Sequence, residues 1–180
     1  MKSAFKYLIT VHNHRKEVRK LMFKCGLYWR GMVHDLSKYN LVELIPGMKY
    51  ANGKVSPHVF QRKKYGYSAA WLHHKAHNKH HYQYWIDSQN DNDVPAEMPI
   101  KYFIEMVCDR IAACKTYLKE QYTIDAALKY YNDHTPIQIH PKTNRMLHTA
   151  LTILAQEGED TLIFVLRQAL KKGKEINERF

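Results

Sequence analysis

Cysteine is scarce in this 180-residue chain, which has three, at positions 25, 108 and 114, and no two of them form a CxxC pair. An odd number of cysteines without paired spacing predicts neither a disulfide framework nor a thiolate zinc site. The amino-terminal residues contain no apolar run long enough for a signal-peptide core or a membrane span. We therefore expect a cytoplasmic protein with no membrane partner.

Strand-like alternation, internal repeats and low-complexity tracts are also missing from the sequence. Apolar residues recur instead at helical spacing, as at Val11, Val18, Leu21, Met22 and Cys25. This pattern favours amphipathic helices that bury one face each. We predict an all-α fold, with one domain over residues 1–180 built as a bundle of about six to eight helices.

Capping and helix-breaking residues set the expected helix bounds. Gly26 is a suitable stop, Asn40 and Ser68 are suitable amino-terminal caps, and Pro99 and Pro141 suit first turns. The predicted helices span residues 3–24, 28–38, 68–87, 99–119, 124–132, 141–157 and 161–172. A further helix is predicted to begin at residue 41 and to be interrupted by Pro46 and Gly47. Segments 50–60 and 88–99 are expected to be loops.

The charge is strongly positive, with 28 lysine and arginine residues against 17 aspartate and glutamate residues and a formal net charge of +11. Such a balance favours a small anionic partner, such as a nucleotide or phosphoester, and leaves nucleic acid open. The basic residues are scattered along the chain, so a generally solvated basic surface is the alternative.

The dipeptide His34-Asp35 in the segment HDLSK offers two metal ligands side by side. A neutral imidazole and a carboxylate suit a divalent ion, and the second carboxylate oxygen is free to bridge a neighbouring metal. Lys38, one turn further on, would meet an anionic substrate. The alternative is a chance dipeptide in which Asp35 merely carries charge on a helix turn.

Five histidines occur within nine residues in the segment WLHHKAHNKHHYQYW. His73 and His80, like His74 and His81, are seven residues apart, so each pair would lie on one stripe of a single helix. Rotating that helix by one residue exchanges the stripes, so the choice within each pair stays open. A solvated polar face or a surface tract that sequesters metal are the alternatives.

Asp109 interrupts an otherwise apolar helix pattern in the segment MVCDRIAACK. A buried carboxylate is costly unless it is paired or binds metal. We therefore expect Asp109 either to point at His34 and Asp35 or to form a salt bridge, for which the candidate partners are Arg15, Arg30 and Arg110.

His14 lies on the first predicted helix, twenty residues before His34. An antiparallel helical hairpin turning at Gly26 would bring the two histidines together. His12 is the near alternative, and either histidine could instead be a surface residue.

In this order the motifs resemble those of the HD-domain metal-dependent phosphohydrolase superfamily, an all-helical fold. HDLSK is similar to the HDxGK form of the HD-GYP phosphodiesterases and of diiron oxygenases related to inositol oxygenase, with Ser37 in place of glycine. HDLSK together with AWLHHxxxNxHHxxYW also resembles a small family over residues 7–159. The resemblance implies one set of metal ligands: His14, His34, Asp35, Asp109, and His73 or His74 with His80 or His81.

These observations predict a phosphohydrolase that uses one or two divalent ions, from among manganese, iron, magnesium, cobalt and zinc. Lys38 and Arg110 would hold the phosphate, and Glu43 would be a further ligand or a proton carrier. An HD-type diiron oxygenase is the first alternative, because histidine-rich ligation suits iron. A non-catalytic protein that binds nucleotide or nucleic acid is the second, with some of the 13 tyrosines as stacking surfaces.

Overall fold

The amphipathic segments form helices in the computed structural model, which describes residues 2–50, 56–135 and 137–173. Within these residues the elements are, in order, α1 (Lys2–Lys24), α2 (Tyr28–Val33), η1 (Leu36–Tyr39), α3 (Leu41–Tyr50), α4 (Pro57–Tyr65), α5 (Ala69–His77), η2 (Tyr82–Trp85), β1 (Ile86–Gln89), β2 (Asn92–Pro95), α6 (Ile100–Leu118), η3 (Lys119–Gln121), α7 (Ala126–Asp133), α8 (Pro141–Glu157) and α9 (Glu159–Lys172). The predicted all-α class is confirmed. One two-stranded hairpin accompanies nine α-helices in the described part of the chain.

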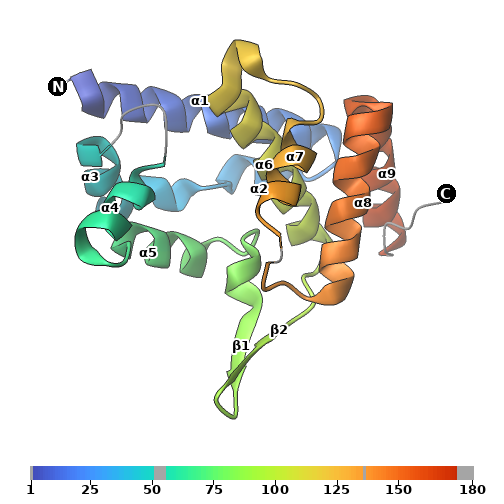
Figure 1. The fold of residues 1–180 in the computed structure, drawn as a ribbon. Coiled ribbons are helices and arrows are strands. Elements are labelled where there is room, and N and C mark those ends of the chain that lie inside the picture. Colours follow the sequence, from blue (N-terminus) through green and yellow to red (C-terminus); the bar gives the residue numbers. More distant parts are fainter. Residues whose placement is uncertain (1, 51–55, 136, 174–180) are drawn as a thin grey trace.

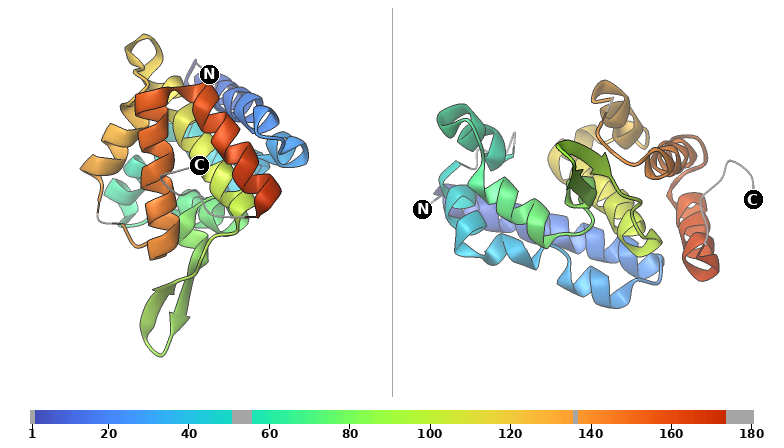
Figure 2. Two further views of the ribbon diagram at one scale, coloured as in Figure 1. Left: turned by 90° about the vertical axis from the view of Figure 1, so that its right-hand side faces the viewer. Right: turned by 90° about the horizontal axis from the view of Figure 1, so that it is seen from below.

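Helices α1 and α6 pack along each other and join the two ends of the molecule. Figure 1 shows α3, α4 and α5 beside the amino-terminal part of α1, whereas α8 and α9 lie at the opposite end. The left view in Figure 2 shows the β1–β2 hairpin projecting from the helices. One end of the molecule is therefore built from helices early in the sequence, and the other end from helices late in the sequence.

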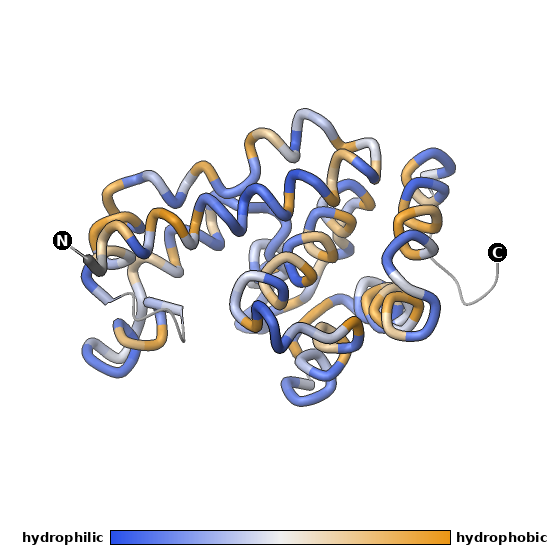
Figure 3. The backbone as a smooth tube through the Cα atoms, turned by 90° about the horizontal axis from the view of Figure 1, so that it is seen from above, coloured by the Kyte–Doolittle hydropathy of each residue, from blue (hydrophilic) through white to orange (hydrophobic). Residues whose placement is uncertain are grey.

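The apolar core runs through α1, α6, α8 and α9. Apolar and polar residues alternate along these helices at helical spacing (Figure 3), so each helix has one face suited to burial. The largest fully buried apolar side chains come from these four helices: Met22, Phe103, Ile104, Ile111, Leu147, Leu151, Leu154, Leu162 and Leu166. The core thus lies toward the end of the molecule that contains α8 and α9.

The chain turns back on itself after α1, as the sequence predicts. Gly26 has a φ of +87°, a left-handed conformation that glycine adopts readily at a helix end. The Arg15 side chain on α1 then donates hydrogen bonds to the backbone oxygens of Met32 and His34, which ties α1 to the end of α2. The helical hairpin therefore brings His14 close to His34.

The predicted helix over residues 68–87 is wrong, because α5 ends at His77. Ser68 caps it by accepting a hydrogen bond from the Trp71 amide, as expected. Asn78 then leaves helical conformation, and its side-chain amide donates to the His74 oxygen at 2.8 Å. Since side-chain amides of this kind compete with helical hydrogen bonds, His80 lies beyond the helix.

Residues 88–99, predicted to be a loop, contain most of the hairpin, including the end of β1 and all of β2. Strands β1 and β2 pair antiparallel, with Gln89 opposite Asn92. Asn90 and Asp91 both have positive φ, and these two residue types favour such tight hairpin turns. The strands are almost fully exposed, so no apolar alternation marked them in the sequence.

Three other helix bounds differ from the predictions. The second helix ends at Val33 instead of residue 38, and Pro46 continues α3 without interrupting it. Asn40 caps α3 through the Val42 amide, as expected. Within the predicted loop 50–60, residues 51–55 lie outside the described part, and α4 begins at Pro57. Among the described helices, none has both the length and the apolar character needed to cross a membrane.

Candidate metal centre

The break between α2 and η1 places His34 and Asp35. His34 is extended, with a ψ of 129°, and Asp35 is left-handed, with a φ of 53°. The left-handed conformation costs an L-residue about 1–2 kcal/mol, although aspartate tolerates it better than most. The kink turns both side chains inward, and each residue is only 2% exposed.

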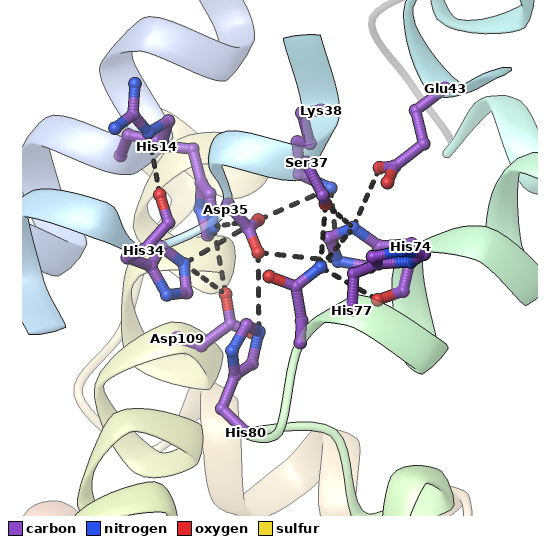
Figure 4. A network of polar contacts seen from close by, with 12 residues as sticks. His14, His34, Asp35, Ser37, Lys38, Glu43, His74, His77, His80 and Asp109 are labelled. Carbon is purple, nitrogen blue, oxygen red and sulfur yellow. Dashed lines mark hydrogen bonds and ion pairs between the residues drawn. The ribbon is translucent and has the colours of Figure 1, made fainter. Parts of the chain in front are cut away.

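The first ligand group consists of His14, His34, Asp35 and Asp109, which come from α1, the α2–η1 break and α6. Nε2 of His14 lies 2.9 Å from Oδ1 of Asp109, and Nε2 of His34 lies 3.5 Å from the same oxygen. Oδ2 of Asp35 is 3.6 Å from Nε2 of His34 and 4.0 Å from Nε2 of His14. Figure 4 shows the four side chains converging on one point.

The second ligand group consists of Asp35 again with His74, His80 and His81, which come from α5 and the turn that follows it. Nε2 of His74 and Nε2 of His80 each lie 3.5 Å from Oδ1 of Asp35. Asp35 therefore faces the first group with Oδ2 and the second group with Oδ1 (Figure 4).

Both groups have dimensions that suit a divalent ion. Metal bonds to nitrogen and oxygen are about 2.0–2.2 Å long, so two ligand atoms on one ion lie at most about 4.4 Å apart. The Asp35 contacts of 3.5–4.0 Å in both groups fall within this limit. Four buried ligand atoms lack a hydrogen-bond partner, and buried polar atoms of this kind are costly unless a cation binds them. They are Nε2 of His34, Oδ1 of Asp35, and Nε2 of His80 and His81. These residues can hold metal.

Two further buried carboxylates orient the imidazoles from behind. Glu105 accepts a hydrogen bond from Nδ1 of His34 at 2.9 Å, and Glu43 accepts one from Nδ1 of His74 at 2.8 Å. A proton on Nδ1 leaves Nε2 free to bind, which is the usual arrangement behind metal-binding histidines. His80 has its Nδ1 3.3 Å from Glu105, but without hydrogen-bond geometry.

Glu105 also forms a possible ligand trio with His34 and His80. Its carboxylate, however, faces the Nδ1 side of both rings and accepts a 2.6 Å hydrogen bond from Nε of Arg30. A guanidinium already balances this charge. We therefore assign Glu105 to holding the two imidazoles and not to a third ion.

The electrostatics of the centre favour a cation. Burial would keep His34 neutral, but the charge of Asp35 and the contacts with Asp109 and Glu105 outweigh it and raise the pKa of His34 to about 10. Burial lowers the pKa of His74 and of His81, so these rings are neutral. His74 and His81 are thus in the neutral state that binds metal, whereas His34 holds a proton that a bound cation would displace.

Lys38, which was predicted from the sequence to hold a phosphate, lies at the edge of both groups. Its Nζ is 3.4 Å from Oδ2 of Asp35 and 3.5 Å from Nε2 of His74. The negative charge of Asp35 outweighs burial and raises the pKa of Lys38, so the ammonium stays charged. The side chain also lines a small cavity with a volume of about 60 Å³.

Other predicted residues belong to neither ligand group. The positive charge of Arg110 acts on the side chains of Tyr82 and Cys114, and Arg110 does not line the cavity. His73 donates to Glu43 and stacks on His77, so the structure places His74 in the second group instead. His12 is exposed, whereas His14 is buried.

Sequence reasoning missed Glu105 and misplaced Arg30. Arg30 was a candidate salt-bridge partner of Asp109, but it pairs with Glu105. The signal for Glu105 was present, because this acid lies four residues before Asp109 on the same helix face and is equally out of place in an apolar pattern.

Glu43 should contribute a pH-dependent part of the stability. Burial opposes its charge, but the hydrogen bonds from His74 and His73 outweigh burial and lower the pKa of Glu43 from 4.5 to about 2. A lowered pKa stabilises the fold fully above pH 4.5, and this contribution is lost as the pH falls through about 2. We expect Glu43→Gln to lower the free energy of unfolding by about 2 kcal/mol at neutral pH.

The measurement is urea denaturation of chelator-treated protein at neutral and at acidic pH. The exposed Glu120 provides the control variant Glu120→Gln. The deficit of Glu43→Gln should shrink toward low pH, and a deficit that stays constant with pH would contradict the assignment.

One family model matches the chain, over residues 3–153, and its description is Family of unknown function (DUF5662). The chain belongs to the DUF5662 family. In this DUF5662 protein the matched segment contains every residue of both ligand groups and ends within α8. Searches of curated proteins and of solved structures gave no match to it.

Proposed function

We propose that the protein is a metal-dependent phosphohydrolase with two divalent ions, related in its ligand order to the HD-domain superfamily. The observation that carries the proposal is the division of Asp35 between two groups, with Oδ2 toward His34 and Oδ1 toward His74 and His80. A carboxylate that bridges two ions is the arrangement expected of two-metal hydrolytic sites.

Such ions, when bound, would lower the pKa of a water molecule and offset the charge of a phosphate ester. Hydrolysis then forms a bond from the water oxygen to phosphorus and breaks the ester bond, and the alcohol departs with a proton. The chain's own part is to fix the ligands through Glu105 and Glu43 and to hold the anionic substrate beside them.

Lys38 is the cation best placed to hold the phosphate. Its contact with Asp35 keeps it charged and fixes its position, and it lines the cavity together with His14 of the first group. A phosphate in that cavity would therefore meet both the ammonium and His14, one of the residues of the first ligand group. Charge stabilisation from a fixed donor of this kind is a large part of phosphoryl-transfer catalysis.

We expect Lys38→Met to lower kcat/KM for a small phosphomonoester by about 100-fold. The measurement is phosphate release from para-nitrophenyl phosphate and from nucleoside monophosphates, with manganese, magnesium, cobalt or iron added in turn. Lys171→Met, which changes an exposed lysine at the far end of α9, is the matched control.

Metal content should be measured on the same samples, because Lys38 lies close to Asp35. A loss of activity with unchanged metal content supports phosphate binding by Lys38. No hydrolysis of any of these esters by the wild-type protein loaded with each metal would contradict the proposed function.

A diiron oxygenase is the second candidate, and the composition of the second ligand group favours it. Three imidazoles from His74, His80 and His81 with one carboxylate suit iron better than magnesium. Iron-dependent oxygen consumption with a polyol or phosphonate would support this function. A protein that purifies with zinc or magnesium alone would exclude it.

A further inference from the structure

The small cavity beside Lys38 has an unusual lining. Its cations are Lys6 and Lys38, and no acidic side chain is among the described residues that line it. Hydroxyl groups and imidazoles supply the remaining polar atoms, from Tyr7, Thr10, His14, Ser56, His58 and Tyr117. A cavity with two cations and many hydrogen-bond donors suits a compact, oxygen-rich anion.

The size of the cavity limits what part of a substrate can enter it. The volume is about 60 Å³, and one water-sized group needs about 10–15 Å³ on this scale. The space therefore takes about four to six oxygen-sized groups, which is close to the four oxygens of one phosphate. One phosphate group would fill this space, so any ester substituent must extend out of the cavity.

The Tyr7 side chain forms one wall of the cavity, and Gly47 on α3 determines the position of the Tyr7 ring. A Cβ atom at Gly47 would lie 2.1 Å from Cζ of Tyr7, which no real contact allows. The phenol thus packs directly on the backbone of α3, and any larger residue at position 47 would push the ring away.

We propose that this cavity is the subsite for the terminal phosphate of a monoester, and that Tyr7, seated on Gly47, excludes phosphodiesters. The inference rests on the proposed function for its choice of phosphate as ligand. It adds a substrate class, because a monoester presents three unsubstituted oxygens to Lys6 and Lys38 and carries only one group that must point out of the cavity.

The test compares methyl phosphate with dimethyl phosphate, which differ by one methyl group and one charge. Binding of each to manganese-loaded protein is measured by titration calorimetry. We expect wild-type protein to prefer the monoester by at least about tenfold. Tyr7→Ala should reduce that preference to a few-fold by admitting the diester, whereas Tyr7→Phe, which keeps the ring, should retain it.

A second variant acts in the opposite direction. Gly47→Ala should displace the ring and weaken methyl phosphate binding by about tenfold or more. The double variant Tyr7→Ala/Gly47→Ala has no ring to displace, so it should bind methyl phosphate like Tyr7→Ala. This rescue distinguishes a displaced wall from a general loss of folding at Gly47.

The outcomes separate this inference from the proposed function. Equal affinity of wild-type protein for the two esters, or an unchanged preference in Tyr7→Ala, would overturn the subsite. Hydrolysis of monoesters and diesters at equal rates would also overturn it, while leaving the phosphohydrolase function in place. A monoester preference in binding without hydrolysis of any ester would contradict the proposed function alone.

Discussion

Asp35→Asn is expected to remove divalent metal from both ligand groups at once. Asp35 contributes a different carboxylate oxygen to each group, and an amide offers one weak oxygen ligand in place of two anionic ones. Loss of an orienting residue behind a metal ligand costs about 10–100-fold in affinity, so loss of this shared ligand should cost at least about 100-fold. The measurement is elemental analysis of protein purified without chelator or affinity-tag metal.

Asp93→Asn on the exposed hairpin is the matched control, because it changes the same chemical group far from the centre. Asparagine has nearly the same shape as aspartate, and circular dichroism can verify that the variant remains helical. If Asp35→Asn retains as much metal as the control does, the shared-carboxylate arrangement is wrong.

Arg30→Met should lower the free energy of unfolding by about 3 kcal/mol. The guanidinium is the charge that balances Glu105, whose side chain is only 1% exposed. Removing one partner of a buried ion pair leaves the other charge uncompensated, which costs about 3–5 kcal/mol, and the partial exposure of Arg30 places the expected value at the lower end. Urea denaturation in the presence of chelator separates this effect from metal binding.

The second arm of the experiment adds Glu105→Gln to Arg30→Met. The neutral amide no longer needs a cation, so the double variant should be more stable than Arg30→Met alone. Arg167→Met on exposed α9 surface controls for loss of a guanidinium elsewhere. A double variant that is less stable than Arg30→Met would show that charge balance is not the reason for the pairing.

Long helices were predictable from the sequence, because burial of one face imposes a strong period on many residues. The helices that contain the core, such as α8 at Pro141–Glu157, match their predicted bounds closely. Short elements were not predictable in the same way. The β1–β2 hairpin is exposed, so its residues follow no burial pattern, and α4 begins within residues 50–60, where Pro, Ser and Asn suggested a loop.

The composition of the centre was predictable to the level of residue type and order. His14, His34, Asp35 and Asp109 meet in one group, as the motif order implied. The choice among the paired histidines was not accessible, because it depended on a helix that ends ten residues earlier than expected. Asn78 ends it with a side-chain hydrogen bond, and a local competition of this kind leaves no periodic trace.

The cavity was beyond reach of sequence reasoning for a different reason. It combines Tyr7, Lys38 and His58 from three separate elements, and their proximity depends on packing of α1 against α3 at Gly47. A glycine inside a helix gives no indication in the sequence of which side chain will occupy the space above it.

The two ligand groups share more than Asp35, since Glu105 holds His34 of the first and lies 3.3 Å from Nδ1 of His80 in the second. A cation bound in one group would pull on a carboxylate that the other group also uses. Occupancy of the two positions would therefore be thermodynamically linked, and the factor by which the first ion changes the affinity for the second would apply equally in reverse. The affinity measured for either ion should therefore depend on whether the other position is filled.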